Sequence, residues 1–280
     1  MRDKIKSNTG VQKKDKMLKI KTAELKRLHW EIKIESALER VRTVAMGMKR
    51  HEDMPDVCRI ISKELQDLGI KEIRNVQTAI IDESKASYLN YEYFRLKKKT
   101  IITAVEYKKQ KDVFAFVKKM LKDPDGFFTK TFKSDELKEW VKYQAKTGQY
   151  VDPRLYEVQS LHYYFYSIGP GALGVSTYAP LSKESTGLFK RFRNVFQLAY
   201  RRFIDIEKAE AQAREAQIQL ALERVRARTM AMQKSDELAD VAALLFKQVS
   251  DLGIKAWTTG FNVWSEDHNF YTDYITNPQG

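Results

Sequence analysis

The sequence contains a single cysteine, Cys58, and only six prolines and four histidines among its 280 residues. One cysteine cannot form an internal disulfide, and such sparse use of cysteine suggests a reducing compartment. No stretch approaches the roughly 18 apolar residues that a membrane-spanning helix needs. The N-terminus is basic, but no apolar segment follows it as a signal peptide would require. We therefore expect a cytoplasmic protein with no membrane segment in this chain.

Residues that could perform catalysis or hold a metal are also sparse. The histidines, His29, His51, His162 and His268, are scattered and cannot form a metal pair with the lone cysteine. No serine or cysteine has the neighbours of an activated nucleophile. Glycine-rich ATP-binding motifs of a kinase domain do not occur either. The sequence thus predicts no catalytic residue, no metal site and no enzyme activity for this chain, and it identifies no cofactor.

Three short motifs match functional patterns only superficially. Residues Gly169–Gly174 fit G-x-G-x-x-G, but a strand-like segment follows where a dinucleotide site needs a helix, so we predict a hairpin turn. His51–Pro55 is similar to the phosphoacceptor motif of histidine kinases, but its proline comes one residue early and begins a helix. Asp123–Gly126 lacks the glutamate of a calcium loop and is interpreted as a turn.

The formal charge of +13 raises the alternative of a nucleic-acid-binding protein. Residues 1–50 hold 15 basic and 6 acidic side chains, so most of the excess lies in the first sixth of the chain. A solvated tail that runs into a helix explains this distribution better than a basic binding arm does. Nucleic acid is therefore the second hypothesis for the partner.

An internal repeat is the strongest signal in the sequence. The segment Ala37–Arg42 recurs as Ala221–Arg226, an offset of 184 residues, and Asp67–Lys71 recurs as Asp251–Lys255. Between residues 37 and 71, 16 of the 35 aligned positions are identical without a gap. Duplicated segments of this kind are the mark of a repeated structural unit.

The repeated segment has the pattern of an amphipathic helix. In the first copy, apolar residues recur at steps of three and four from Met54 to Leu68, and the second copy repeats this stripe from Leu238 to Leu252. Gly69 and Gly253 follow the stripes at the position where a helix end favours a left-handed residue. Each copy is therefore predicted to contain an incoming helix, a break near residue 53 or its equivalent, and a core helix.

The rest of the first copy is predicted to be an α+β domain with a central antiparallel sheet. Segments rich in β-branched and aromatic residues predict strands. The expected strands are 73–81, 88–96, 100–107, 161–168 and 173–178. Two helical segments, 112–121 and 134–146, form an insert between the third and fourth strands. The second copy has too few residues after its core helix for a complete sheet, which favours a truncated module.

A long helix is predicted from residue 192 to about residue 232, because this segment lacks proline and glycine. Apolar and small residues at steps of three and four form a coiled-coil seam, which then changes register. Such a helix either packs on its own domain or pairs with a second copy and transmits a shift of register. The residues assigned to this dimer and signalling helix are Phe196, Ala199, Phe203, Ile206, Ala213, Leu220, Leu222 and Val225.

This order of elements resembles the GAF-like sensor modules of bacterial signalling proteins, in particular the tandem sensor region of multidomain sensor histidine kinases. The stretches Ala209–Gln217 and Leu222–Met232 carry most of the likeness. The resemblance implies a cytosolic sensory input of a two-component system and a homodimer. It does not identify a ligand, because a fold does not fix what its site binds.

The predicted domains are a basic tail and incoming helix (1–35), a complete GAF-like module (36–191), the linker helix (192–234) and a truncated second module (235–280). Aromatic residues on the strands could line a ligand pocket below the 112–146 insert, although core packing explains such residues more often. The candidates for a small-molecule site are Tyr91, Tyr93, Trp140, Tyr164 and Tyr166. The leading hypothesis is a sensory and dimerisation region that signals to an output domain, such as a histidine kinase, outside this chain.

Overall fold

The computed structural model describes residues 2–276, with side chains from residue 16 onward. Two compact units make up the chain, Met1–Phe203 and Ile204–Gly280. The helix α5 (Lys183–Met230) contributes residues to both units. Each unit is described by itself.

The first unit is built on a six-stranded sheet in which every neighbouring pair is antiparallel, in the order β3-β2-β1-β6-β5-β4. The strands are β1 (Ile73–Asp82), β2 (Ser87–Phe94), β3 (Lys99–Glu106), β4 (Phe127–Lys133), β5 (Ser160–Ser167) and β6 (Gly171–Thr177). The helices are α1 (Arg2–Met46), α2 (Met54–Asp67), α3 (Lys111–Lys122), α4 (Ser134–Lys146) and the first part of α5. Short 3-10 turns cover His51–Asp53, Tyr107–Lys109 and Pro153–Tyr156.

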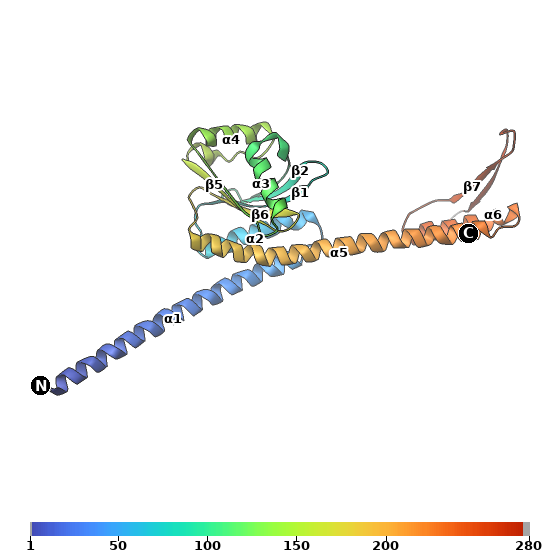
Figure 1. Cartoon of the computed structure of the whole chain (residues 1–280). Coiled ribbons are helices and arrows are strands. Elements are labelled where there is room, and N and C mark those ends of the chain that lie inside the picture. Colours follow the sequence, from blue (N-terminus) through green and yellow to red (C-terminus); the bar gives the residue numbers. More distant parts are fainter. Residues whose placement is uncertain (1, 277–280) are drawn as a thin grey trace. The chain divides into compact units, whose positions relative to one another are not determined.

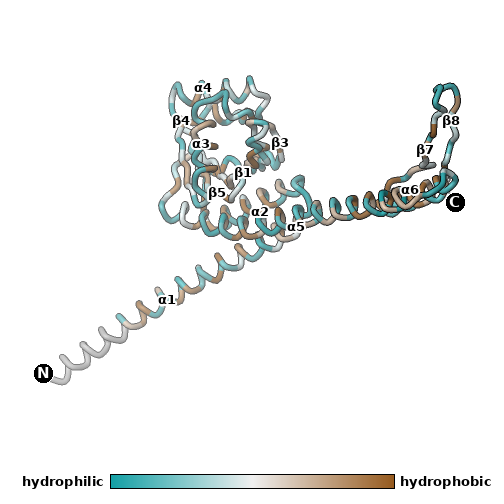
Figure 2. The backbone as a smooth tube through the Cα atoms, turned by 45° about the vertical axis from the view of Figure 1, so that its right-hand side comes forward, coloured by the Kyte–Doolittle hydropathy of each residue, from teal (hydrophilic) through white to brown (hydrophobic). Residues whose placement is uncertain are grey.

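Helices cover both faces of this sheet. Figure 1 shows α3 and α4 on one face and α2 with the first part of α5 on the other. The predicted stripe of α2 is confirmed, since Val57, Cys58, Ile61 and Leu65 are fully buried. In Figure 2 the trace of α2 changes repeatedly between apolar and polar colours, as expected for a helix with one apolar side. The α+β class with a central antiparallel sheet is therefore confirmed.

The structure adds one strand that the sequence interpretation missed. Residues 127–133, which had been placed in a helical insert, form the edge strand β4 between α3 and α4. Its sequence, FFTKTFK, puts phenylalanine and lysine on both faces of the strand, so it shows no period-two pattern of apolar and polar residues. A hairpin turn does join the strands β5 and β6, but it ends at residue 170, and Gly171–Gly174 belong to β6.

The long helix begins nine residues earlier than predicted, at Lys183. Ser182 precedes it, and the hydroxyl oxygen of Ser182 accepts the backbone N–H of Ser185 at 3.0 Å, which caps the helix. Gly187 lies inside the first turns without ending the helix. A single glycine costs only about 1 kcal/mol relative to alanine in a helix, which packing readily offsets.

The two repeats share structure as well as sequence. α6 (Leu238–Asp251) has the bounds of α2 shifted by 184 residues, and a 3-10 turn precedes each helix. The carboxylate of Asp53 accepts the backbone N–H groups of Lys49 and Arg50 at 2.9 and 3.2 Å. In the second copy, the carboxylate of Glu237 accepts the backbone N–H groups of Gln233 and Lys234, at 3.0 and 3.2 Å.

A pairing of an exposed arginine with a buried side chain repeats in the same way. Arg40 donates from Nε and Nη2 to the two carboxylate oxygens of Glu64, at 2.9 and 2.7 Å. Arg224 donates to Oε1 of Gln248 at 3.3 Å, at positions offset by 184. In the second unit α6 is followed by an antiparallel hairpin of β7 (Thr259–Trp264) and β8 (Tyr271–Thr276). No helix within residues 2–276 has the length and apolar content needed to cross a membrane.

Two glycines should respond oppositely to replacement by alanine. Gly69 has a φ of +91°, as predicted for the end of α2, and Gly69→Ala should lower the free energy of unfolding by about 1 kcal/mol because a Cβ disfavours this conformation. Gly187 is helical and exposed, and Gly187→Ala should raise the free energy of unfolding by about 1 kcal/mol. Urea denaturation of the full chain measures both. Equal effects of the two substitutions would contradict the assigned conformations.

Candidate functional site

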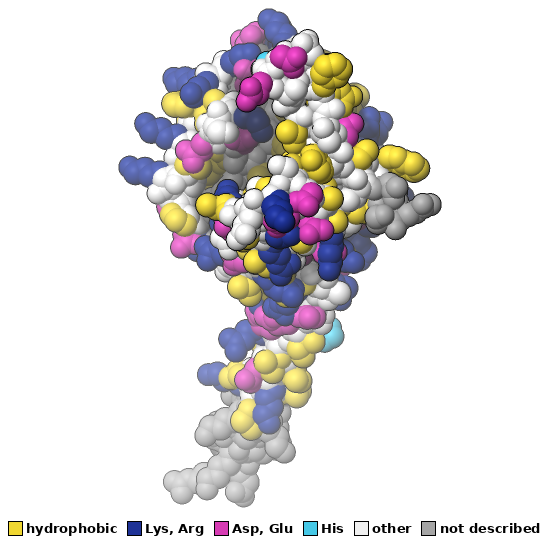
Figure 3. Space-filling model, turned by 90° about the vertical axis from the view of Figure 1, so that its right-hand side faces the viewer, with side chains coloured by type: hydrophobic (Ala, Val, Ile, Leu, Met, Phe, Trp, Pro, Cys, Tyr) yellow, Lys and Arg dark blue, Asp and Glu magenta, His cyan; other side chains and the backbone are white. Residues whose placement is uncertain are grey.

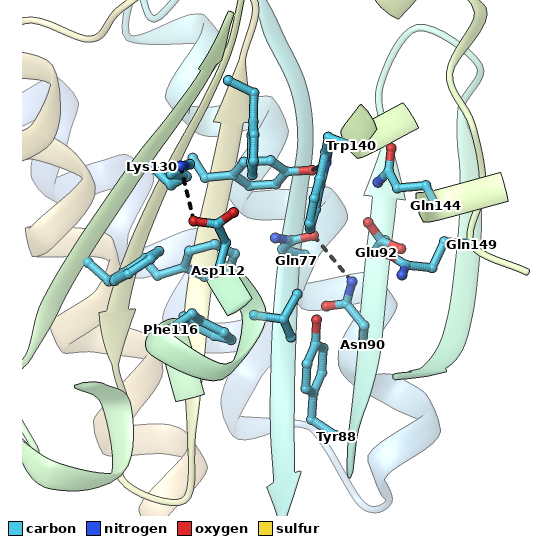
Figure 4. Close-up of a pocket in the computed structure, with 15 residues that line it drawn as sticks. Gln77, Tyr88, Asn90, Glu92, Asp112, Phe116, Lys130, Trp140, Gln144 and Gln149 are labelled. Atoms are coloured by element: carbon cyan, nitrogen blue, oxygen red, sulfur yellow. Dashed lines mark hydrogen bonds and ion pairs between the residues drawn. The ribbon is translucent and has the colours of Figure 1, made fainter. Parts of the chain in front are cut away.

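A pocket lies between the sheet and the helices α3 and α4 of the first unit (Figure 4). Its cavity volume is about 40 Å³. Polar side chains of β1 and β2, namely Gln77, Asn90 and Glu92, form one part of the lining. The aromatic residues of the lining are Tyr88, Phe116, Phe128, Phe132, Trp140, Tyr163 and Phe165.

Strand pairing brings residues from distant parts of the sequence to this face. Glu92 of β2 lies opposite Gln77 of β1, and Gln77 lies opposite Gly174 of β6. Gly174 in turn faces Phe165 of β5, which faces Phe128 of β4. Because side chains of directly opposed residues lie on the same face of a sheet, this row forms the floor of the pocket.

Gly174 gives the ring of Phe165 its place on that floor. A Cβ built at residue 174 would overlap the ring of Phe165. The ring therefore lies over the backbone of β6, where only glycine leaves room for it. The ring of Phe165 also packs against the ring of Phe116 of α3, with the ring centroids 4.4 Å apart.

Trp140 of α4 forms the aromatic wall together with two residues of the sheet. Its ring stacks on Phe132 with centroids 4.5 Å apart and an interplanar angle of 13°. Its indole N–H donates to the hydroxyl oxygen of Tyr163 at 3.1 Å. The N–H of the tryptophan is therefore used within the wall, and the ring faces supply apolar surface.

The polar floor is a buried chain of hydrogen bonds. Asn75 donates from Nδ2 to Oε1 of Glu92 at 2.7 Å and to Oε1 of Gln77 at 3.0 Å. Asn90 donates from Nδ2 to the same oxygen of Gln77 at 3.3 Å. Ser176 of β6 donates its hydroxyl to Oδ1 of Asn75. These buried groups hold one another in fixed orientations.

Glu92 is the unusual ionisable group of this floor. Its burial raises the pKa of the carboxyl group from 4.5 to about 7, although the charge of Arg74 and the hydrogen bond from Asn75 oppose the shift. Arg74 is itself buried, with Nε 3.6 Å from the carboxylate of Asp152 and its guanidinium 4.9 Å from the ring centroid of Phe94. A buried carboxyl group that titrates near neutral pH is common at functional sites.

Two buried acceptor atoms at the pocket have no hydrogen-bond partner among the described residues. They are Oδ1 of Asn90 and Oε1 of Gln144, which extends from α4. Both side chains are at least 95% buried. Buried acceptors are paired in the great majority of cases, so these two atoms indicate a water or a ligand in the pocket.

The predicted ligand residues do not come together. Trp140 lines the pocket, but Tyr91, Tyr93, Tyr164 and Tyr166 alternate with the lining residues and point to the other face of the sheet. Tyr164 accepts the backbone N–H of residue 181, and Tyr166 packs against the ring of residue 189 in α5. The predicted tyrosines of β2 and β5 thus lie on the face of the sheet opposite to this pocket. The sequence did not distinguish the two faces, because both carry aromatic residues.

Gln77, Asn90 and Glu92 were missed by the sequence interpretation. Their signal was present, since Asn90 and Glu92 are polar residues at alternate positions of a strand rich in aromatic residues. A solvent-facing side of the strand would have given the same pattern. These polar side chains are buried only because α3 and α4 cover this face of the sheet.

The residues assigned to a dimer helix fall into two groups. Phe196, Ala199 and Phe203 are at most 5% exposed and lie in the interior of the first unit. For these three the interpretation is corrected, because packing of a helix on its own domain gives the same spacing as a seam between copies. Four others, Ile206, Ala213, Leu220 and Leu222, are exposed, and Val225 is half-buried.

Within the part of the chain that the structure describes, no group of three or more His, Cys, Asp or Glu side chains could hold a metal ion. The thiol of Cys58 is buried between α2 and the sheet, 3.4 Å from Oγ1 of Thr78. Burial raises the pKa of this thiol to about 12. Cys58 is therefore a core residue rather than a nucleophile.

No protein-family model matches this chain, and no curated protein matches it. Among solved structures, it is similar to the crystal structure of bacteriophytochrome RpBphP3 from the photosynthetic bacterium R. palustris, with a TM-score of 0.45 and 11% sequence identity. The match covers 89% of this chain and 49% of the bacteriophytochrome chain, so the chain spans about half the length of that protein.

Glu92 should make the stability of the protein depend on pH. Between pH 4.5 and 7 the folded state keeps a proton that the unfolded state releases, so stability falls as pH rises through this window. Glu92→Gln removes this dependence on pH. The free energy of unfolding of the variant, relative to that of the unsubstituted protein, should therefore rise by roughly 1 kcal/mol for each pH unit between pH 4.5 and 7. Thermal unfolding at pH 5 and pH 7.5 measures the gain. Glu83→Gln, at an exposed turn, is the control and should show no such trend.

Proposed function

We propose that this chain is a non-catalytic sensory and dimerisation region of a signal-transduction protein. The first unit is the sensor module, and the second unit contains part of a second module of the same GAF-like kind. The signal passes along α5 toward an output domain such as a histidine kinase. The pocket below α3 and α4 supports a small-molecule input.

One observation carries this proposal. A single helix, α5, closes the first unit with the buried residues Phe196 and Phe203 and also supplies the repeated segment Ala221–Arg226 that opens the second. The equivalent segment of the first copy, Ala37–Arg42, lies in α1. An incoming helix thus precedes each core helix. Helices that belong to two modules at once can transmit a change of packing from one to the other.

The exposed part of α5 supplies a surface for dimerisation. Ile206, Ala209, Ala213, Ala216 and Leu220 recur at steps of three and four, and all five are exposed in the single chain. Small and apolar residues at this spacing suit close pairing of two helices. A homodimer through this surface, the 206–220 seam, is part of the proposal.

The alternative, nucleic-acid binding by residues 1–50, has weaker support. The structure describes side chains only from residue 16, so 5 of the 15 basic side chains of this segment lie outside the described ones. In the described part of α1, the exposed basic residues are interleaved with exposed apolar ones, as the end of α1 in Figure 3 shows. Leu18, Leu25 and Ile32 recur every seven residues and are at least 64% exposed. This spacing suits helix pairing better than contact with phosphates.

Association should depend on the 206–220 seam. Ala213→Glu places a charge at the centre of the seam and should weaken dimerisation at least about 10-fold, because like charges would meet in the dimer. Ala211→Glu makes the same change two residues away, at an exposed position on the other side of the helix, and should leave association unchanged. Sedimentation equilibrium measures both. A strictly monomeric protein, or equal effects of the two substitutions, would refute the proposed dimer.

A further inference from the structure

When Glu92 is ionised, the hydrogen-bond chain of the pocket floor has only one consistent polarity. An ionised Glu92 can only accept, so Asn75 must present its amide nitrogen to it. The same nitrogen also donates to Gln77, which must therefore present its oxygen. Asn90 then has to donate its own nitrogen to that oxygen. The amide oxygen of Asn90 is left over as an acceptor, so its orientation follows from the network.

Two unpartnered acceptor atoms therefore lie where a ligand would lie. Oδ1 of Asn90 on the floor and Oε1 of Gln144 on α4 are buried without a hydrogen-bond partner among the described residues. Glu92 contributes a carboxylate beside them, and Figure 4 shows Glu92 close to both Asn90 and Gln144. The N–H of Trp140, a donor in the lining, is already bound to Tyr163.

The charges of the lining have the same bias. Lys130 is the basic residue of the lining, and its Nζ lies 3.0 Å from Oδ1 of Asp112. The buried Arg74 lies beside the carboxylate of Asp152. No ion pair within 4.0 Å involves Glu92 among the described residues; the charge of the buried Arg74 and the hydrogen bond from Asn75 favour its ionised form. A bound cation would offset the cost of that buried charge, whereas an anion would add to it.

We propose that this pocket binds a small organic cation that donates several N–H groups, of the amidinium, guanidinium or ammonium class. Its N–H groups satisfy Asn90, Gln144 and Glu92, and its charged face lies against the rings of Trp140 and Phe116 in the lining. This inference deepens the proposed sensory function and rests on it for its biological meaning.

The size of the cavity limits the group that enters it. A volume of about 40 Å³ corresponds to roughly three water sites, since one water needs about 10–15 Å³ by the same measure. A planar head group with about four non-hydrogen atoms fills such a space. A larger ligand would place this head group inside and its remainder at the mouth near Asp112 and Lys130.

Three probes of one shape test the proposal. Acetamidinium, acetamide and acetate each have four non-hydrogen atoms and differ mainly in charge and in the number of N–H groups. We expect acetamidinium to bind the full-length chain at least about 10-fold more tightly than acetamide, because hydrogen bonds between charged groups are stronger than those of a neutral group. Acetate should not bind, because its negative charge would lie beside the carboxylate of Glu92. The readout is the shift of the Trp140 indole N–H resonance at pH 8, assigned with Trp140→Phe.

Variants separate the charge from the shape of the site. Glu92→Gln keeps the acceptor for Asn75 and should weaken acetamidinium about 10-fold with little effect on acetamide. Asn90→Leu should weaken both probes, and Glu83→Gln should change neither. Each variant is used only if its circular dichroism and unfolding midpoint show a folded chain; Asn90→Ser replaces Asn90→Leu if that variant does not fold.

Tighter binding of acetate than of acetamidinium would overturn this inference, and so would acetamidinium binding that Glu92→Gln leaves unchanged. Because the readout lies in the first unit, it is independent of oligomeric state. A dimer that ignores acetamidinium refutes the ligand class alone. A strict monomer that binds it refutes the proposed signalling dimer alone.

Discussion

Strand β1 is the part of the structure on which the rest depends, because helical layers cover both of its faces. Its residues from Ile73 to Ala79 are all buried, in the middle of a six-stranded sheet. On the side of α2, Val76 and Thr78 meet an apolar helix that includes Cys58. On the other side, Asn75 and Gln77 carry the polar floor of the pocket. One strand thus joins the apolar core to the candidate site.

This arrangement favours function over stability. Apolar residues at 77, 90 and 92 would bury surface at no polar cost, whereas the present residues must satisfy one another inside the protein. The network succeeds for Asn75 and Gln77 but leaves acceptors of Asn90 and Gln144 open toward the cavity. Local violations of packing rules are expected where a protein binds something. The exposed face of β3, by contrast, shows ordinary alternation.

The same local hydrogen bonds occur in both repeated segments, with different side chains. The helix caps at Asp53 and Glu237 use carboxylates of different length to bind the same pair of backbone N–H groups. The pair Arg40–Glu64 is ionic, whereas its equivalent ends on Gln248. Gln248 accepts a hydrogen bond from its arginine without a buried carboxylate. The two segments thus share the hydrogen bond and differ in its electrostatics.

Much of the fold followed from sequence because its signals are local. The steps of three and four in α2 and α6, the glycine at the end of each, and the repeat itself all depend on residues near one another in the chain. Strand positions followed from composition, apart from β4, whose sequence lacks alternation between apolar and polar residues. The class, and the order of the elements other than β4, were thereby set by sequence alone.

The tertiary structure decided which faces are interior. Spacing alone could not tell that Phe196 and Phe203 pack within their own unit while Ile206 and Ala213 stay exposed, since both sets share one periodicity. In the same way, Tyr163 and Tyr164 are equally aromatic, and only the positions of α3, α4 and α5 assign them to opposite faces of the sheet. The pocket brings together residues separated by more than 80 positions in sequence, and such proximity arises only when the strands pair.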